Sequence, residues 1–321
     1  MSTPTPDSTL SANQLAERTS RAVDAAAAAG RELGLAVHDA RVLHDAFSVV
    51  VQLSPAPVVV RVPVVLPHGW PADAQRARQE RELALVAWLA DGGHPVVRPS
   101  PLVPREPLQR AGFSMTFWEW VELDPGTTPD YVADAKLVPP LHAAMRDYPG
   151  DLPFLAPLAA TIPSCLAFLE QRTDLFAPAD LQRAQREWSA LAPLLTSRER
   201  FAAAFPGAEL QPIHGDAPAY NLLRTAAGIR YADFEDVTLG PVEWDLAGFG
   251  EAAAAAYDAA AAAGGMRPLD REVLRVMDTA RMLQSIACFA LAPQLPLLAA
   301  ALTPSLEQWR TLPFAAGLVG S

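Results

Sequence analysis

The sequence changes character near residue 130, and this change limits the folds available to it. Before that point, two Val-rich runs at 47–53 and 57–65 are separated by only three residues and predict a β-hairpin. The aromatic run FSMTFWEWVE at 113–122 predicts a further strand, and residues 73–90 read as one helix between them. This first part should therefore be a small sheet that carries an internal helix.

After residue 130 nearly every segment reads as a helix, and several are rich in Ala and Leu. Only 211–234 interrupts them, as short β segments around two acidic motifs. A β-rich lobe followed by a helical lobe, with polar motifs near the junction, predicts an α+β protein with a cleft. The expected helices span 131–147, 160–172, 178–195, 241–263, 269–290 and 295–311.

We expect no signal peptide, because MSTPTPDSTLSAN has neither a basic start nor an apolar core. We expect residues 1–15 to form a disordered tail. Ser11 and Gln14 nevertheless fit a capping box that opens an Ala-rich helix ending near Gly30 or Gly34. The apolar stretch 283–302 contains Gln and Pro, which favour two packed helices meeting at a Pro break over a membrane span.

Composition excludes some classes of function. The net charge is −11, and the 25 Lys and Arg residues form no basic run, so we expect no nucleic-acid partner. Cys165 and Cys288 belong to no metal-binding pattern and should be buried free thiols. We expect a cytoplasmic protein without a membrane partner. The acidic balance is compatible with a cationic substrate.

The most informative motif is HGDAPAYN, residues 214–221, in which Asp216 precedes Asn221 by five residues. Asp233 follows Asp216 by 17 residues, in the sequence YADFEDV. Carboxylate and amide oxygens of this kind suit Mg²⁺. Singly, each residue also fits a turn or a helix cap. Together they match the set that phosphoryl transfer needs: a base-like Asp, a nearby Asn and a later Asp that binds the metal.

With these motifs and GPVEWDLA at 240–247, the chain resembles the aminoglycoside phosphotransferase family, and weaker agreement extends over about 35–310. The resemblance implies a protein-kinase-like bilobal fold, with a nucleotide-binding lobe at 16–122, a hinge near 117–122 and a helical lobe at 123–321.

The resemblance also assigns roles to individual residues. It implies that Asp216 is the catalytic acid/base, that Asn221 and Asp233 bind Mg²⁺, and that Asp245 braces the catalytic loop. Pro218 and Tyr220 depart from the residues that are common in this loop, which puts acceptor access in doubt. His214 and His142 are expected to be structural.

The same resemblance places a nucleotide site in the first lobe. Arg61 stands where many relatives have a phosphate-binding Lys, and a guanidinium can hold a phosphate or carboxylate through two parallel hydrogen bonds. Its helix partner is either Glu80 or Glu82, and helical periodicity does not decide between them. The family's spacing favours Glu82.

Further contacts with the nucleotide are expected on both sides of its site. Ser48 is a candidate phosphate contact, because no glycine-rich loop precedes its strand. Trp120 and Val121 lie at the expected hinge, where backbone groups would hold the adenine edge.

The expected activity is transfer of the γ-phosphoryl group of ATP or GTP, with Mg²⁺, to a hydroxyl of a small molecule such as an aminoglycoside-like antibiotic, an amino alcohol or another metabolite. Two alternatives remain: a nucleotide-binding pseudokinase or regulator without turnover, and a divalent-metal phosphohydrolase. Glu235, Asp236 and Glu243 are expected to be surface acids, although contact with the acceptor remains open. The sequence determines neither the acceptor nor the oligomeric state.

Overall fold

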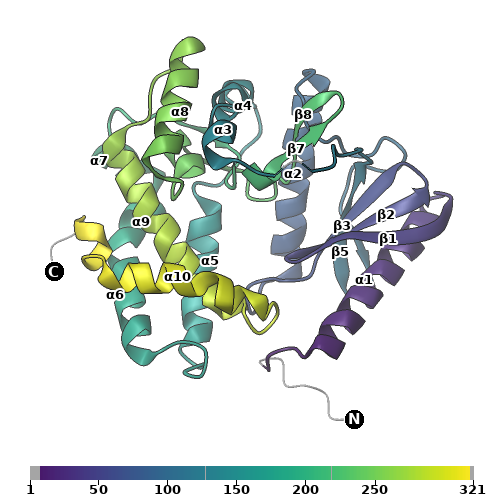
Figure 1. Ribbon diagram of the computed structural model, residues 1–321, viewed down its shortest axis with the longest axis horizontal. Helices are drawn as coiled ribbons and strands as arrows, with labels where there is room; N and C mark the ends of the chain where they lie inside the picture. Colours follow the sequence, from purple (N-terminus) through teal and green to yellow (C-terminus); the bar gives the residue numbers. More distant parts are fainter. Residues whose placement is uncertain (1–7, 127, 218, 319–321) are drawn as a thin grey trace.

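The structure, a computed structural model, describes residues 8–126, 128–217 and 219–318 and divides them into two lobes (Figure 1). The first lobe is built on a five-stranded antiparallel sheet, and the second is mainly helical. The predicted α+β class and bilobal arrangement are confirmed. Pro218 lies outside the described residues.

The sheet has the strand order β1-β2-β3-β5-β4. The predicted hairpin is confirmed as β2 and β3, in which Val50 lies opposite Arg61. The first and fourth strands were not predicted, because most of β1 is exposed and polar and β4 has only three residues. The strands are β1 (Val37–Asp45), β2 (Ser48–Pro55), β3 (Val58–Pro63), β4 (Leu108–Arg110) and β5 (Phe113–Glu119).

Alternation along β3 assigns its side chains to the two faces of the sheet. Val58, Val60 and Val62 pack in the same apolar cluster as the buried alanines of α1 (Ala12–Glu32). Val59 packs in a second cluster, with side chains of α2 (Ala72–Asp91). Arg61 alternates with the valines of the first cluster and therefore shares the face that α2 covers, between the sheet and the helical lobe (Figure 1).

The capping box at the start of α1 is confirmed, since Ser11 and Gln14 bond to each other's backbone N–H groups. The helix begins at Ala12, so the last residues of the expected tail at 1–15 are helical. Residues 1–7 lie outside the described part of the chain.

The second lobe contains the predicted helices with altered bounds. The segment 131–147 forms two short helices, and 241–263 begins with a 3₁₀ turn before its helix. The short helix α7 (Arg198–Ala204) was not predicted. The others are α3 (Tyr131–Ala135), α4 (Val138–Met145), α5 (Ala156–Leu169), α6 (Pro178–Leu195), α8 (Gly250–Ala263), α9 (Arg271–Ala287) and α10 (Leu297–Thr311), with 3₁₀ turns η1 (Ala219–Asn221), η2 (Val242–Leu246), η3 (Cys288–Leu291) and η4 (Phe314–Gly317).

Two short antiparallel strand pairs interrupt the helices of the second lobe. β6 (Leu210–Ile213) pairs with β9 (Thr238–Pro241), and β7 (Leu222–Thr225) pairs with β8 (Gly228–Tyr231). The strand β9 lies beyond the predicted β region, which ended at residue 234. The loop between β6 and β7 and the segment between β8 and β9 carry the two acidic motifs.

The apolar stretch 283–302 forms the end of α9, the turn η3 and the start of α10, as the Pro-break hypothesis predicts. Among the described residues, no helix is long and apolar enough to span a membrane. Both cysteines are free; Cys165 is buried and Cys288 only partly so.

An apolar cluster joins the two lobes. It combines side chains of α2 and β5 with side chains of α4 and of the segment that carries Asp233. The lobes therefore share one core along the edge of the cleft. Its buried members are Leu83, Leu85, Val86, Leu89, Val96, Trp118, Leu141, Met145, Leu152, Leu222, Tyr231, Phe234 and Val237.

Candidate active site

Arg61 is the link between the sheet and the acidic motifs. It lies on the inner strand β3, between β2 and β5, and is buried. Its guanidinium forms an ion pair with Glu82 of α2. The same group lies 2.6 Å from a carboxylate oxygen of Asp233 and 2.6 Å from one of Glu235. Arg61 therefore connects three carboxylates from two segments of the chain.

The choice between the two candidate glutamates is settled in favour of Glu82. Residues two apart on an α-helix point to nearly opposite sides. Glu82 is fully buried against Arg61. Glu80 faces solvent, where it pairs with Arg76 at 2.7 Å.

The charges around Arg61 explain its protonation. Burial alone would lower the pKa of Arg61, but the charges of Asp233, Glu235 and Glu82 outweigh it and raise the pKa well above its ordinary value. Burial raises the pKa of Glu82, and Arg61 only partly opposes this shift because its charge is shared with the other two carboxylates. Arg61 stays charged in this pocket.

Asp216 and Asn221 lie in the loop between β6 and β7. The amide nitrogen of Asn221 donates to the backbone carbonyl of Asp216 at 2.7 Å and to its carboxylate at 3.2 Å. Both nitrogen contacts are made to Asp216, so the amide oxygen of Asn221 is left as a separate acceptor. The Asp216 side chain is 59% exposed.

The surroundings of Asp216 raise the pKa of its carboxylate. Burial at the cleft floor raises the pKa of Asp216 to about 7, while the charge of Arg281 acts in the opposite direction. Water in the open cleft offsets part of this burial effect, because more than half of the side chain remains exposed.

Asp245 holds the start of the loop at 214–221, which the resemblance identifies as the catalytic loop. Its carboxylate accepts hydrogen bonds from the backbone N–H groups of His214, at 3.0 Å, and Gly215, at 2.7 Å. His142 bonds to the same carboxylate at 2.9 Å. Burial alone would raise the pKa of Asp245, but its bond to His142 and the nearby histidine charges lower it.

The two histidines are structural, as expected. His142 is buried and also bonds to the hydroxyl of Tyr257 at 2.9 Å. His214 bonds through Nε2 to the carbonyl of Ala232 at 2.9 Å and accepts the N–H of Asp216 at 3.3 Å. His214 thus ties the catalytic loop to Ala232, the residue directly before Asp233.

Gly215 lets the two acidic motifs approach closely. Its φ is +88°, and a Cβ on it would lie 2.1 Å from the carbonyl oxygen of Asp236. Only glycine combines this conformation with this approach. The carbonyl of Gly215 accepts the indole N–H of Trp244 at 2.9 Å and a guanidinium N–H of Arg281 at 3.3 Å.

Arg281 was not identified from the sequence. It comes from α9, stacks 3.7 Å above the ring of Trp244 and lies 3.9 Å from the Asp216 carboxylate. Nothing in the local sequence of a long C-terminal helix marks this one arginine, because its partners are 66 and 65 positions away, at Gly215 and Asp216.

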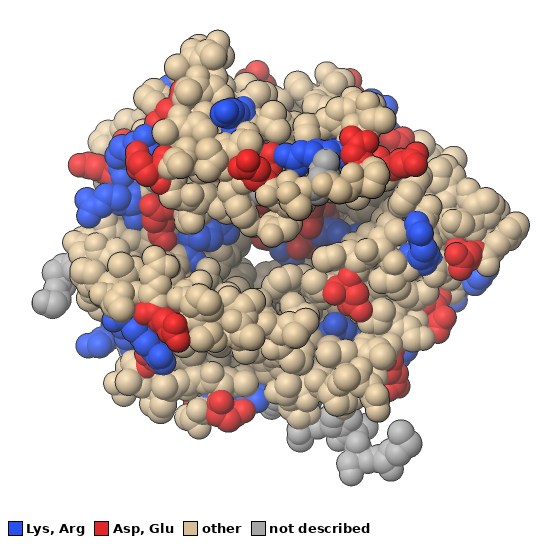
Figure 2. Space-filling view, viewed as in Figure 1, with Lys and Arg blue, Asp and Glu red and all other residues tan. Residues whose placement is uncertain are grey.

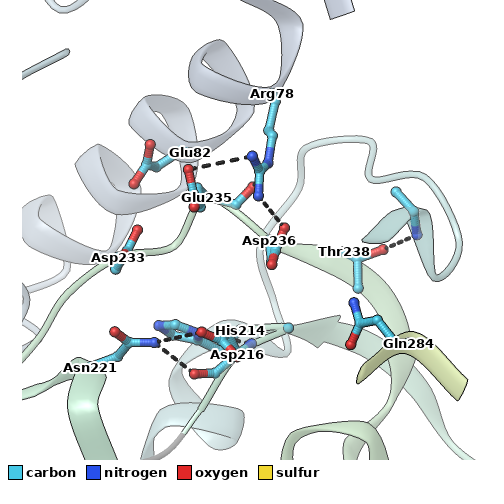
Figure 3. Close-up of polar contacts among 12 residues, drawn as sticks. Arg78, Glu82, His214, Asp216, Asn221, Asp233, Glu235, Asp236, Thr238 and Gln284 are labelled. Carbon is cyan, nitrogen blue, oxygen red and sulfur yellow. Dashed lines mark hydrogen bonds and ion pairs between the residues drawn. The ribbon is translucent and has the colours of Figure 1, made fainter. Parts of the chain in front are cut away.

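The expectation that Glu235, Asp236 and Glu243 are surface acids is wrong. Asp236 pairs with Arg78 of α2 at 2.5 Å, and Glu235 also faces Arg78 (Figure 3). Glu235 pairs with Arg61 as well, at 2.6 Å. Burial made these ion pairs necessary, since a carboxylate removed from water needs a partner.

Glu243 lies in η2 and is fully buried. It pairs with Arg267 at 2.7 Å and accepts the N–H of Asp270 at 2.7 Å. Both contacts belong to the packing of the helical lobe, so Glu243 has a structural role.

The residues expected to bind Mg²⁺ fit that ion. Figure 3 shows Asp233 above Asn221, with the amide nitrogen of Asn221 turned toward Asp216. One oxygen of Asp233 contacts Arg61, and the other oxygen and the amide oxygen of Asn221 supply hard ligands. No group of three or more His, Cys, Asp or Glu among the described residues could hold a metal by itself. Mg²⁺ usually takes one or two protein carboxylates and completes its shell with water and phosphate oxygens.

The other nucleotide contacts expected from the sequence stay predictions, with one restriction. Ser48 opens β2 directly after the turn that joins it to β1, and it is buried. The N–H of Trp120 already donates to the carbonyl of Pro57 at 2.9 Å, so that group is not free for an adenine edge. Val121 follows it beyond the end of β5.

A cavity of about 450 Å³ opens beside Asp216 and Asn221. Aromatic rings form part of its wall: Tyr131 stacks on Phe249 at 4.9 Å and meets the edge of Tyr220 at 5.9 Å. Other parts of the lining are polar, and include Arg281, Ser285 and Ser305. Figure 2 shows a hollow near the centre of one face, with acidic and basic side chains inside it.

The comparison with family models gave one match. The model described as "Phosphotransferase enzyme family" matches residues 47–276, which include both acidic motifs and Arg61. No curated protein matches the sequence.

Solved structures of similar fold include small-molecule kinases. Choline kinase LicA from Streptococcus pneumoniae is 14% identical, with a TM-score of 0.58 over 88% of this chain and 98% of that one. A spectinomycin phosphotransferase solved with ADP and spectinomycin is 14% identical, with a TM-score of 0.52 over 87% of this chain and 90% of that one. At these identities the likeness shows the fold alone, and it confirms the protein-kinase-like fold that the sequence predicts.

Proposed function

The chain belongs to the phosphotransferase enzyme family, and on this premise we propose that it transfers the γ-phosphoryl group of ATP or GTP to a hydroxyl of a small molecule. The resemblance noted in the sequence is thereby confirmed at the level of the family. The observation that carries the proposal is the bridge from Glu82 through Arg61 to Asp233, beside Asp216 and Asn221.

Each polar side chain takes one task in this reaction. Asp216 aligns the acceptor hydroxyl and accepts its proton as the hydroxyl oxygen bonds to the γ-phosphorus. The bond from that phosphorus to the bridging oxygen breaks, and the nucleoside diphosphate leaves with the electron pair. Arg61, held by Glu82, binds phosphate oxygens, so that positioning and electrostatics supply most of the rate.

Asn221 and Asp233 would hold Mg²⁺ through the amide oxygen and a carboxylate oxygen. When bound, Mg²⁺ would supply positive charge to the phosphate oxygens. The Arg61–Asp233 contact has to loosen or rearrange to make room for nucleotide phosphates, since one guanidinium nitrogen is engaged by Asp233 at 2.6 Å.

The acceptor would occupy the cavity beside Asp216. Its aromatic wall offers a flat surface to a ring or to an apolar edge, and Ser285, Ser305 and Arg281 offer hydrogen bonds. The acidic balance of the sequence is compatible with a cationic acceptor, and Glu235, Asp236 and Glu243 are acids within or close to the two motifs in the sequence. Each of these pairs with an arginine, so they supply little free negative charge to attract a cation.

The phosphohydrolase alternative has less support. Such enzymes commonly place two metal ions side by side to activate water. The part of the chain that the structure describes gathers no cluster of three or more His, Cys, Asp or Glu that could hold a metal.

The proposal is tested by following ADP or GDP release with Mg²⁺ and each triphosphate. The acceptor panel should contain amino sugars, amino alcohols, uncharged polyols and hydroxy acids, since the aromatic and polar walls admit all four classes. We expect release that depends on one class of acceptor, and a phosphorylated product with a mass increase of one phosphate.

Release of inorganic phosphate from the nucleotide, at a rate that does not depend on any acceptor, would identify a hydrolase. Nucleotide binding without release for any member of the panel would favour the regulator. Either result would contradict the proposed transfer reaction.

A further inference from the structure

Helix α2 carries two charged side chains one turn apart, Arg78 and Glu82. Residues four apart lie on the same side of a helix. Both point toward the segment that carries Asp233, as Figure 3 shows. Glu82 is explained by its ion pair with Arg61, whereas Arg78 has no role in the proposed reaction so far.

Arg78 contacts the 233–236 segment through three nitrogen atoms. Its Nε donates to the backbone carbonyl of Glu235 at 3.0 Å, and one Nη lies 2.5 Å from the carboxylate of Asp236. The other Nη lies 3.4 Å from the carboxylate of Glu235. A planar guanidinium that holds a backbone carbonyl and two side chains fixes the position and the direction of the segment.

The contacts of Arg78 connect it to Arg61 on one side and to the loop before Asp216 on the other. Glu235 lies between Arg78 and Arg61, so the two arginines share one carboxylate. The carbonyl of Asp236 packs against Gly215, directly before Asp216. Asp233 itself adopts a φ of +60°, a left-handed conformation that Asp tolerates better than most residues other than glycine.

We propose that Arg78 is a positioning residue, whose guanidinium holds the 233–236 segment so that Asp233 presents its free oxygen to Mg²⁺ and nucleotide. The inference rests on the proposed function, because it assigns Asp233 to the metal. Arg78 touches neither metal nor substrate in this scheme and acts only through the segment.

The helix also supplies a matched control. Arg76 pairs with Glu80 on the exposed side of α2, two residues before Arg78, at 2.7 Å. Arg76→Gln removes the same charge from the same helix without touching the 233–236 segment. Arg78→Lys keeps the charge but loses the planar fork, and Asp236→Asn weakens the contact from the other side.

The experiment measures Mg-ADP and metal-free ADP binding by calorimetry, with hydrogen exchange of peptides covering 232–237 in the free protein. Mutation of groups that orient metal ligands commonly lowers metal affinity about 10- to 100-fold. We therefore expect Arg78→Gln to weaken Mg-ADP binding by about tenfold or more, and metal-free ADP binding much less. Exchange at 232–237 should quicken, and Arg78→Lys should fall between the two forms.

Arg76→Gln should match the wild type in every measurement. Arg78→Gln and Asp236→Asn should each weaken Mg-ADP binding, and their effects should add only in part in the double variant, because both break the Arg78–Asp236 contact. If Arg78→Gln does not fold, Arg78→Lys and Asp236→Asn carry the same comparison.

The inference is overturned if folded Arg78→Gln binds ADP with the same dependence on Mg²⁺ as the wild type and exchanges hydrogen at 232–237 at the same rate. The same result in folded Arg78→Lys and Asp236→Asn would overturn it too. So would an equal loss of ADP affinity with and without Mg²⁺, which indicates general destabilisation. A wild-type protein that does not bind Mg-ADP would instead contradict the proposed function, so the two failures are distinguishable.

Discussion

At the scale of single residues, two carboxylates of one cleft have different partners. Asp216 contacts the amide of Asn221 and lies 3.9 Å from Arg281, with most of its side chain exposed. Asp233 is bound by Arg61 at 2.6 Å and belongs to the segment that α2 holds. The proposed division between hydroxyl alignment and metal binding follows from these different partners.

Replacement of each acid by its amide should separate the two tasks. Asp216→Asn keeps the shape but removes the proton acceptor, and we expect turnover to fall about 10²- to 10⁴-fold with Mg-nucleotide affinity nearly unchanged. Asp233→Asn should weaken Mg-nucleotide binding and turnover together. Steady-state rates and calorimetry on both variants measure the split. Near-normal turnover in Asp216→Asn would contradict the mechanism.

At the scale of elements, the catalytic loop and the 233–236 segment meet at Gly215. Asp245 of η2 holds the N–H groups of the loop, and the carbonyl of Asp236 occupies the space where a Cβ would lie. The relative position of the two acidic motifs therefore depends on a glycine and on the 3₁₀ turn that braces it.

Gly215→Ala should damage both stability and turnover. A left-handed conformation at a residue other than glycine costs of order 1–3 kcal/mol, and the methyl group would also displace Asp236. Gly207→Ala is the control, because Gly207 has nothing within 4 Å of a built Cβ. Chemical denaturation and rates compare the two. A Gly215→Ala protein as stable and active as Gly207→Ala would show that this contact does not position the site.

Much of this arrangement could be predicted from local sequence, and some of it could not. The capping box, the Val alternation of β2 and β3 and the Pro break near 296 are local signals, and each gave the observed element. The sequence of strand β1 contains no such local signal, because its side chains are mostly exposed and polar.

The pairing partners required the tertiary fold. Arg78 and Asp236 are 158 residues apart, and no periodicity links them. The spacing of HGDAPAYN and YADFEDV singled out two motifs that the fold brings together at Gly215. It contained nothing to show that two arginines from the first lobe neutralise Glu235 and Asp236, so the surface assignment failed.

At the scale of the whole molecule, the cleft has an uneven charge balance. With every group ionised, the five carboxylates of Glu82, Asp216, Asp233, Glu235 and Asp236 exceed the three guanidinium groups of Arg61, Arg78 and Arg281 by two negative charges. Protonation of Glu82 or Asp216, whose pKa values burial raises, lowers this excess. A divalent cation would balance this negative charge, whereas a nucleotide without metal would increase it.

Mg-ATP should therefore stabilise the folded protein more than either Mg²⁺ or ATP alone. A ligand that binds only the folded state at about 100 times its Kd adds about 2.7 kcal/mol to the free energy of unfolding. Thermal denaturation with Mg-ATP, ATP with chelator, and Mg²⁺ alone measures the difference. An unchanged midpoint at millimolar Mg-ATP, or the same rise with chelator, would count against the metal assignment.

The apolar cluster that joins the lobes limits how this protein can be divided. Leu83 and Leu89 of α2, Trp118 of β5, and Met145 of α4 bury one another across the hinge. A fragment that ends at residue 122 would keep all five sheet strands and helices α1 and α2. It would, however, expose its own apolar side chains of this cluster to water. We therefore expect neither lobe to stay folded in solution when the chain is cut at the hinge expected near 117–122.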